Sequence, residues 1–174
     1  MDPVLCVAAE WTGTGLDKEV SMPFVVEREG YIISPYFDYL SFFFNRTWKY
    51  PARDILGLMI KLADANTGSI SKREVSKALT VEDRQRLSEG VQICKEILCR
   101  FGAQEDRIFL GTINAGHPGG MLPLTEQEAG SLHHRRLPEN LYVADATLLP
   151  RALGNPPILT IIALAKRVSK LCRR

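Results

Sequence analysis

Apolar residues near the start of the chain fall into short runs that predict strands. Residues 4–10 are apolar enough for a buried strand. Residues 24–28 and 31–34 flank the turn sequence Glu29-Gly30, so together they predict a β-hairpin. Residues 64–75 lack a sustained pattern, and we expect a turn or a short strand there.

Helical spacing of apolar residues dominates the middle of the chain. We expect helical structure in residues 36–48 and a helix over residues 51–64, where a proline suits the first helical position. The clearest helix covers residues 81–101, because Thr80 and Asp83 form a capping box in front of it. Its apolar stripe is expected to face the core and comprises Leu87, Val91, Cys94, Leu98 and Phe101.

The last third of the chain predicts strand, loop, strand and helix in that order. We expect strands over residues 107–113 and 140–150, and a helix within residues 154–172 whose apolar residues are largely buried. Between the strands lies the sequence N-A-G-H-P-G-G-M-L at 114–122. Its glycines permit backbone angles that other residues avoid, and Pro118 lacks an N–H donor. This loop is therefore shaped to bring backbone close to another group.

Composition narrows the class of protein. A chain of 174 residues predicts one domain, and 22 Lys and Arg against 20 Asp and Glu give a net charge of +2, too little for a nucleic-acid-binding field. We expect the cluster at residues 133–136 to be solvated. The four cysteines lack metal-ligand spacing, so we expect buried reduced thiols and no metal. No apolar run approaches a membrane span, and no charged leader precedes an apolar segment, which favours the cytoplasm.

Three sequence blocks in the last third resemble a known family. They are H-P-G-G at 117–120, E-N-L-Y-V-A-D-A-T-L-L-P at 139–150 and G-N-P-P-I-L-T-I-I-A-L-A-K-R-V at 154–168. In this order they closely resemble the C-terminal signature of the glucose-methanol-choline (GMC) oxidoreductases, flavoproteins that oxidise alcohols. The resemblance is strong from about residue 110 to residue 168 and weak before it.

The resemblance implies a fold and a missing part. It implies an α+β fold, with an antiparallel sheet that carries helices on one face and a final helix that belongs to the flavin side. Residues 1–107 would supply substrate-domain strands and helices, and residues 108–174 the signature region of the same compact unit. The family's FAD-binding domain opens with GxGxxG. Here Gly13 and Gly15 begin such a pattern, but Lys18 takes the third glycine position and no helix is expected after it. The chain therefore resembles the C-terminal portion of a GMC enzyme, with an incomplete FAD site.

The same resemblance assigns the chemistry to individual residues. His117 falls on the catalytic histidine, and an imidazole suits removal of a hydroxyl proton while hydride leaves the carbon for flavin. Asp145 and Ala146 fall where the family contacts FAD. From the residues alone, His117 favours a loop histidine bonded to backbone, and only the neighbouring blocks favour the catalytic role. Asp145 also suits a turn former.

The start of the final helix carries the remaining assignments. Pro157 and Ile158 match flavin-contacting positions, and the first amides of this helix would face the charge that gathers on reduced flavin. The helix is also simply well started by its prolines and by Asn155 as a cap. The family's second catalytic side chain falls on Pro156, one residue after Asn155. Either Asn155 substitutes for it, or His117 works with another donor, or the second role is absent.

Two hypotheses follow for function. The first is the C-terminal part of an FAD-dependent alcohol oxidase or dehydrogenase, whose partners are a small-molecule alcohol and the missing FAD-binding domain. The alternative is a non-catalytic binding or assembly module that retains the fold, which Pro156 favours. In either case an isolated fragment would expose the apolar face that meets the flavin domain and could self-associate.

Overall fold

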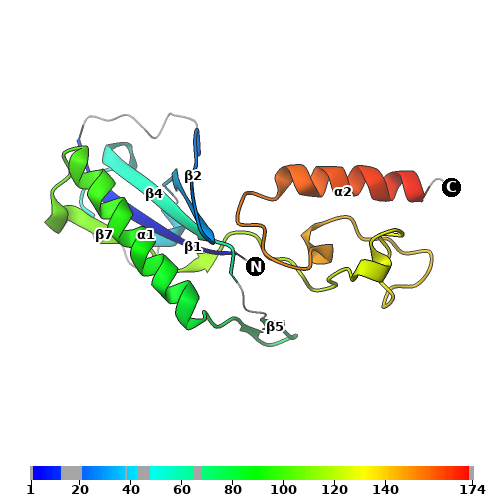
Figure 1. The fold of residues 1–174 in the computed structure, drawn as a ribbon. Coiled ribbons are helices and arrows are strands. Elements are labelled where there is room, and N and C mark those ends of the chain that lie inside the picture. Colours follow the sequence, from blue (N-terminus) through cyan, green and yellow to red (C-terminus); the bar gives the residue numbers. More distant parts are fainter. Residues whose placement is uncertain (1, 13–20, 38, 43–47, 65–67, 173–174) are drawn as a thin grey trace.

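An antiparallel sheet organises the first two thirds of the chain in this computed structural model (Figure 1), which describes residues 2–12, 21–37, 39–42, 48–64 and 68–172. The strands are β1 (Pro3–Glu10), β2 (Val26–Arg28), β3 (Tyr31–Pro35), β4 (Ile55–Leu62), β7 (Ile108–Leu110) and β8 (Asn114–Ala115). They lie in the order β2-β3-β4-β1-β7, and β8 also pairs with β1. A separate hairpin joins β5 (Ser69–Ile70) to β6 (Val75–Ser76). The class is therefore α+β with an antiparallel sheet.

Two α-helices accompany the sheet, α1 (Val81–Arg100) and α2 (Ile158–Leu171). Five short 3-10 helices are also described: Tyr39–Phe42, Ala52–Asp54, Glu105–Arg107, Glu126–Glu128 and Ala146–Leu148. None of the helices in the described residues is long and apolar enough to cross a membrane.

The two central strands are buried on both faces. Residues 5, 7 and 9 of β1 and residues 58, 60 and 62 of β4 share one apolar cluster with the buried face of α1. Residues 4, 6 and 8 of β1 share the second cluster with Phe42, Trp48 and Met59. Strand alternation explains this division, because neighbouring side chains point to opposite faces. Helix α1 covers one face of the sheet, and aromatic side chains cover the other.

Several predicted elements are confirmed. Strand β1 covers the predicted run, and the β2–β3 hairpin turns at Gly30, whose φ of 79° suits a residue without a side chain. Helix α1 begins at the predicted capping box, in which the amide of Asp83 donates to the Thr80 hydroxyl and the amide of Thr80 donates to the Asp83 carboxylate. Of its expected stripe, three residues are buried and Phe101 is exposed.

The helix predicted over residues 51–64 is wrong, because β4 occupies Ile55–Leu62 in the centre of the sheet. A strand that is buried on both faces shows a continuous apolar run, and periodicity does not separate such a run from a buried helix. In residues 36–48, only Tyr39–Phe42 is helical among the described positions. Gly13, Gly15 and Lys18 lie outside the described residues.

The end of the chain departs from the prediction in two ways. Residues 140–150 form no strand; they contain the 3-10 helix Ala146–Leu148. Helix α2 forms as predicted, but Figure 1 places it well apart from α1 and from the strands. Within the described residues neither apolar cluster includes an α2 side chain, and Leu159 is 80% exposed. The expected burial of its apolar side is met at Val168 but is wrong for Ile158, Leu159 and Ile162, which are exposed. In the described residues only α1 covers the sheet.

The cysteines divide into two classes. Cys6 and Cys94 are buried thiols, as expected, whereas Cys99 and Cys172 are exposed, so the expected burial is wrong for these two. Burial raises the pKa of the Cys94 thiol to about 12, which keeps it protonated and unreactive.

Leu98→Ala tests whether α1 is held by the core. Leu98 is fully buried, so we expect its truncation to lower the free energy of unfolding by about 2–5 kcal/mol. The matched control is Leu159→Ala on exposed α2, which should change it by less than about 0.5 kcal/mol. Urea denaturation measures both, and equal losses would contradict the assigned core.

Candidate functional site

Sheet register brings the glycine loop to the start of β1. Strands β7 and β8 both run antiparallel to β1, with Val7 opposite Leu110 and Val4 opposite Asn114. The chain therefore leaves β8 beside the first residues of β1. The amide of Gly116 donates to the main-chain oxygen of Asp2 at 2.9 Å, which fixes the loop one residue before His117.

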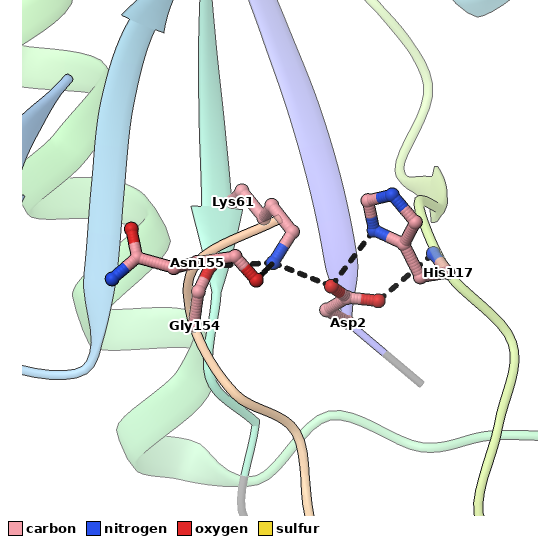
Figure 2. Close-up of polar contacts among 5 residues, drawn as sticks. All are labelled: Asp2, Lys61, His117, Gly154 and Asn155. Carbon is pink, nitrogen blue, oxygen red and sulfur yellow. Dashed lines mark hydrogen bonds and ion pairs between the residues drawn. The ribbon is translucent and has the colours of Figure 1, made fainter. Parts of the chain in front are cut away.

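His117 is held by the carboxylate of Asp2 (Figure 2). The main-chain amide of His117 donates to Oδ1 of Asp2 at 2.8 Å, and Nδ1 of the imidazole lies 3.0 Å from Oδ2. The Asp2 side chain is only 6% exposed, whereas that of His117 is 37% exposed. The imidazole is thus anchored on one side and open on the other.

The ammonium of Lys61 completes this cluster. Its Nζ lies 2.5 Å from Oδ2 of Asp2 and donates to the main-chain oxygens of Gly154 and of Asn155, the latter at 3.2 Å. The Lys61 side chain is 1% exposed. A buried charge is stable only when it is paired and hydrogen-bonded, and here three acceptors meet the three donors of the ammonium.

A cavity of about 670 Å³ opens next to the imidazole. Its volume is within the range of small-molecule sites. The lining joins the His117 loop and the β5–β6 hairpin to the segment that leads into α2, including Ala146, Asn155 and Pro157. Lys77, Arg136 and Arg151 also line it, with Asp2 and Asp64. Because Lys61 and Lys77 neutralise these two carboxylates, the cavity suits a polar ligand that carries negative charge.

The glycines of the loop permit a close backbone approach. A Cβ at Gly119 would lie 2.6 Å from the main-chain oxygen of Ala146, and the amide of Gly120 donates to that oxygen at 3.0 Å. Two further amides, those of Leu122 and Leu124, donate to the oxygens of Thr147 and Leu148. The loop is thus shaped to lie against residues 146–148.

The structure brings some predicted site residues together and separates others. His117, Ala146, Asn155 and Pro157 border the same cavity. Asp145 is exposed, and its Oδ1 accepts from the amide of Thr147 as the cap of the 3-10 helix.

Asn155 and the first residue of α2 lie apart from the imidazole. The carboxamide of Asn155 donates to Glu27 at 3.1 Å, and Figure 2 shows it on the far side of Lys61 from His117. Pro157 precedes α2 without a side-chain cap bond, so Asn155 does not cap it. Ile158 begins α2, is 62% exposed and is not part of the cavity lining.

Asp2 and Lys61 are the site residues that sequence reasoning missed. Lys61 is the one charged residue in the apolar run 55–62, and a lysine inside a buried strand signals a buried ion pair. The assignment of that run to a helix concealed this signal.

Glu128 organises the loop that leads to Arg136. Its carboxylate accepts from the amides of Arg135 and Thr125 and from the Thr125 hydroxyl, at 2.8, 2.9 and 2.8 Å. These bonds, led by that from Arg135, lower the pKa of Glu128 from 4.5 to about 2. His134 is buried in this loop, so the expectation of a fully solvated cluster at 133–136 is wrong for that residue.

Comparison with known proteins yields a relative without an assigned activity. The chain is 39% identical to an uncharacterized protein of Methanocaldococcus jannaschii over 115 residues, which make up 66% of this chain and 29% of that protein. The chain therefore spans less than a third of the length of that relative. No family model matches the chain.

Glu128→Gln tests the acid sensitivity of this loop. Because the pKa of Glu128 is depressed in the folded chain, its stabilising contribution is present above about pH 4.5 and is lost as the pH falls towards about 2. We expect the free energy of unfolding of the wild type and the variant to differ at neutral pH and to converge over that window. Urea denaturation at a series of pH values measures this. Glu126→Gln removes an exposed carboxylate from the same 3-10 helix as the control, and a gap that persists at pH 2 would contradict the assignment.

Proposed function

We propose that this chain is the C-terminal, substrate-binding part of an FAD-dependent oxidoreductase of the GMC type, which oxidises CH–OH groups of a small alcohol. The observation that carries the proposal is the position of His117. Its imidazole, anchored by a buried carboxylate, borders a cavity that the segment leading into α2 also lines. Each of the three sequence blocks that resemble the family contributes residues to the lining of this cavity.

In this proposal His117 removes the hydroxyl proton. Nε2 of the imidazole has no hydrogen bond among the described residues, and the ring borders the cavity. It therefore offers a proton acceptor on the open side, as acid–base catalysis requires. Hydride acceptance is the chemistry that FAD supplies when it is bound.

The residues around the cavity fit a flavin. Ala146 and Pro157 border the cavity, and α2 begins directly after Pro157 with no acidic residue in its first turn. Its first amides lack partners within the helix and present a partial positive charge. The surplus of basic side chains in the lining also suits an anionic cofactor. Asp145 stays a predicted contact, with one oxygen already used by its own turn.

The rest of the FAD site would lie in a domain outside this chain. The matched segment makes up only 29% of the relative's length, which supports a longer protein in which a further domain carries the rest of the site. The exposed apolar residues of α2 also support a covering domain, and without it they favour self-association. We propose the cytoplasm as the location, which suits thiols outside any disulfide such as Cys6 and Cys94. The isolated chain should bind FAD weakly and show no turnover.

His117→Asn in the complete FAD-loaded gene product tests the proposed function. We expect the rate of flavin reduction by an alcohol to fall by about 10²–10⁴-fold, the usual contribution of a positioned acid–base group. Anaerobic loss of the visible flavin absorbance, measured over a panel of primary and secondary alcohols, gives this rate. His133→Asn, in a loop whose histidine bonds to Pro138, is the control. A complete gene product that binds no flavin would overturn the proposal in favour of a non-catalytic module.

Asn155→Ala tests the second catalytic side chain. Because its carboxamide bonds to Glu27 on the far side of Lys61, we expect kcat/KM to fall less than about tenfold, below the range of an acid–base group. Glu27→Gln, which keeps Asn155 but changes its acceptor, is the matched control. A loss as large as that of His117→Asn would instead show that Asn155 turns to the substrate in the complete enzyme.

A further inference from the structure

The Asp2 carboxylate is positioned to select one tautomer of His117. Oδ2 of Asp2 lies 2.5 Å from the Lys61 ammonium and 3.0 Å from Nδ1 of the imidazole. A carboxylate paired with an ammonium is ionised and can only accept hydrogen bonds. The hydrogen between Oδ2 and Nδ1 must therefore belong to the ring, which leaves the lone pair of a neutral imidazole on Nε2.

Lys61 supports Asp2 and has no donor left for a ligand. All three donors of its ammonium have acceptors, namely Asp2 and the main-chain oxygens of Gly154 and Asn155. With a side chain only 1% exposed, it has no open contact with the cavity ligand. Its effect reaches the imidazole through the carboxylate alone.

Lys61 also ties His117 to the start of α2. Asn155 is followed by two prolines and then by the first residue of the helix. The contacts His117–Asp2–Lys61–Gly154 therefore run continuously from the imidazole to the chain that enters α2, as Figure 2 shows. These contacts fix the position of the imidazole relative to the start of α2.

A purely stabilising role does not explain this cluster. Apolar side chains of similar volume often replace a buried ion pair at no cost, because removing two charges from water costs several kcal/mol per ion. Here Asp2, one member of the pair, lines the cavity, and its carboxylate contacts an imidazole that lines the same cavity. Such an arrangement matches the carboxylate that orients a catalytic histidine in hydrolases.

We propose that Asp2 and Lys61 are positioning residues, which hold His117 as the tautomer protonated on Nδ1 and set it in place relative to the start of α2. The catalytic use of that tautomer rests on the proposed function, whereas the tautomer itself does not. In the complete enzyme, the Asp2→Asn exchange would stabilise the opposite tautomer, and we expect it to lower the rate of flavin reduction by roughly 10²–10⁴-fold.

Nitrogen-15 NMR of histidine-labelled chain tests the proposal directly. Spectra at about pH 9, above the ordinary titration range of histidine, distinguish the two neutral tautomers, and His117→Asn assigns the signal. We expect the Nδ1–H form to dominate in the wild-type chain and to be lost in Asp2→Asn, while Glu96→Gln, at an exposed position of α1, leaves it unchanged. A wild-type spectrum dominated by the Nε2–H form would overturn the proposal without any variant.

The double variant Asp2→Asn with Lys61→Met separates positioning from stability. It removes both buried charges, so we expect a free energy of unfolding nearer the wild type than that of Lys61→Met alone, which strands the carboxylate. The Nδ1–H tautomer should remain lost in the double variant. Recovery of both properties together would show that the pair only stabilises the fold.

The same measurements distinguish this inference from the proposed function. A dominant Nδ1–H form that depends on Asp2, in a gene product that oxidises no alcohol, would support the positioning and overturn the oxidoreductase. An active enzyme in which the Asp2→Asn exchange leaves the His117 tautomer unchanged would support the oxidoreductase and overturn the positioning.

Discussion

The ammonium of Lys61 lies out of contact with water, and the chain around it is arranged to satisfy it. An isolated charge in such a place is strongly unfavourable, so its three acceptors must be present whenever β4 is folded. Those acceptors come from the start of β1 and from the segment before α2. One buried charge thereby determines where two distant parts of the sequence meet.

The sheet makes this meeting possible through its register. Val4 lies opposite Lys61 on one side of β1 and opposite Asn114 on the other. Strand alternation then directs Lys61 to the face away from α1, the face that also carries Met59. The helix-covered face is filled with apolar side chains, and the polar cluster occupies the end of the opposite face. The apolar core and the polar cluster thus occupy opposite faces of the same strands.

The sequence predicts correctly those elements that depend on a few neighbouring residues. The capping box fixed the start of α1, and the glycine turn fixed the β2–β3 hairpin, because both depend on a few neighbouring residues. Strand β4 was misassigned because its pairing partners lie far away in the sequence. Residues 140–150 have the composition of a strand, but their backbone bonds go to the His117 loop at 120–124 instead. The apolar face of α2 predicts burial, but in the described residues Val168 alone of this helix is buried, and neither apolar cluster includes an α2 side chain.

The site residues also differ in how far the sequence predicts them. His117 was identified because its loop has an unusual sequence, and the cavity beside it confirms that the loop approaches another segment. Its partner Asp2 stands 115 positions earlier, and no sequence spacing connects them. Only the pairing of β8 with β1 brings the two residues together. The prediction therefore found the histidine that borders the cavity and missed Asp2 and Lys61, the residues that hold it.

The division of the thiols has a practical consequence for following the molecule in solution. Cys99 lies in the last turn of α1, Cys172 directly follows α2, and both are exposed. Figure 1 shows the C-terminal ends of these two helices near opposite sides of the ribbon. Cys6 and Cys94 are shielded from reagents. Maleimide dyes or nitroxide spin labels would attach at these two native sites without engineering. The distance between the two labels would then report whether α2 changes its orientation relative to α1 when further polypeptide binds.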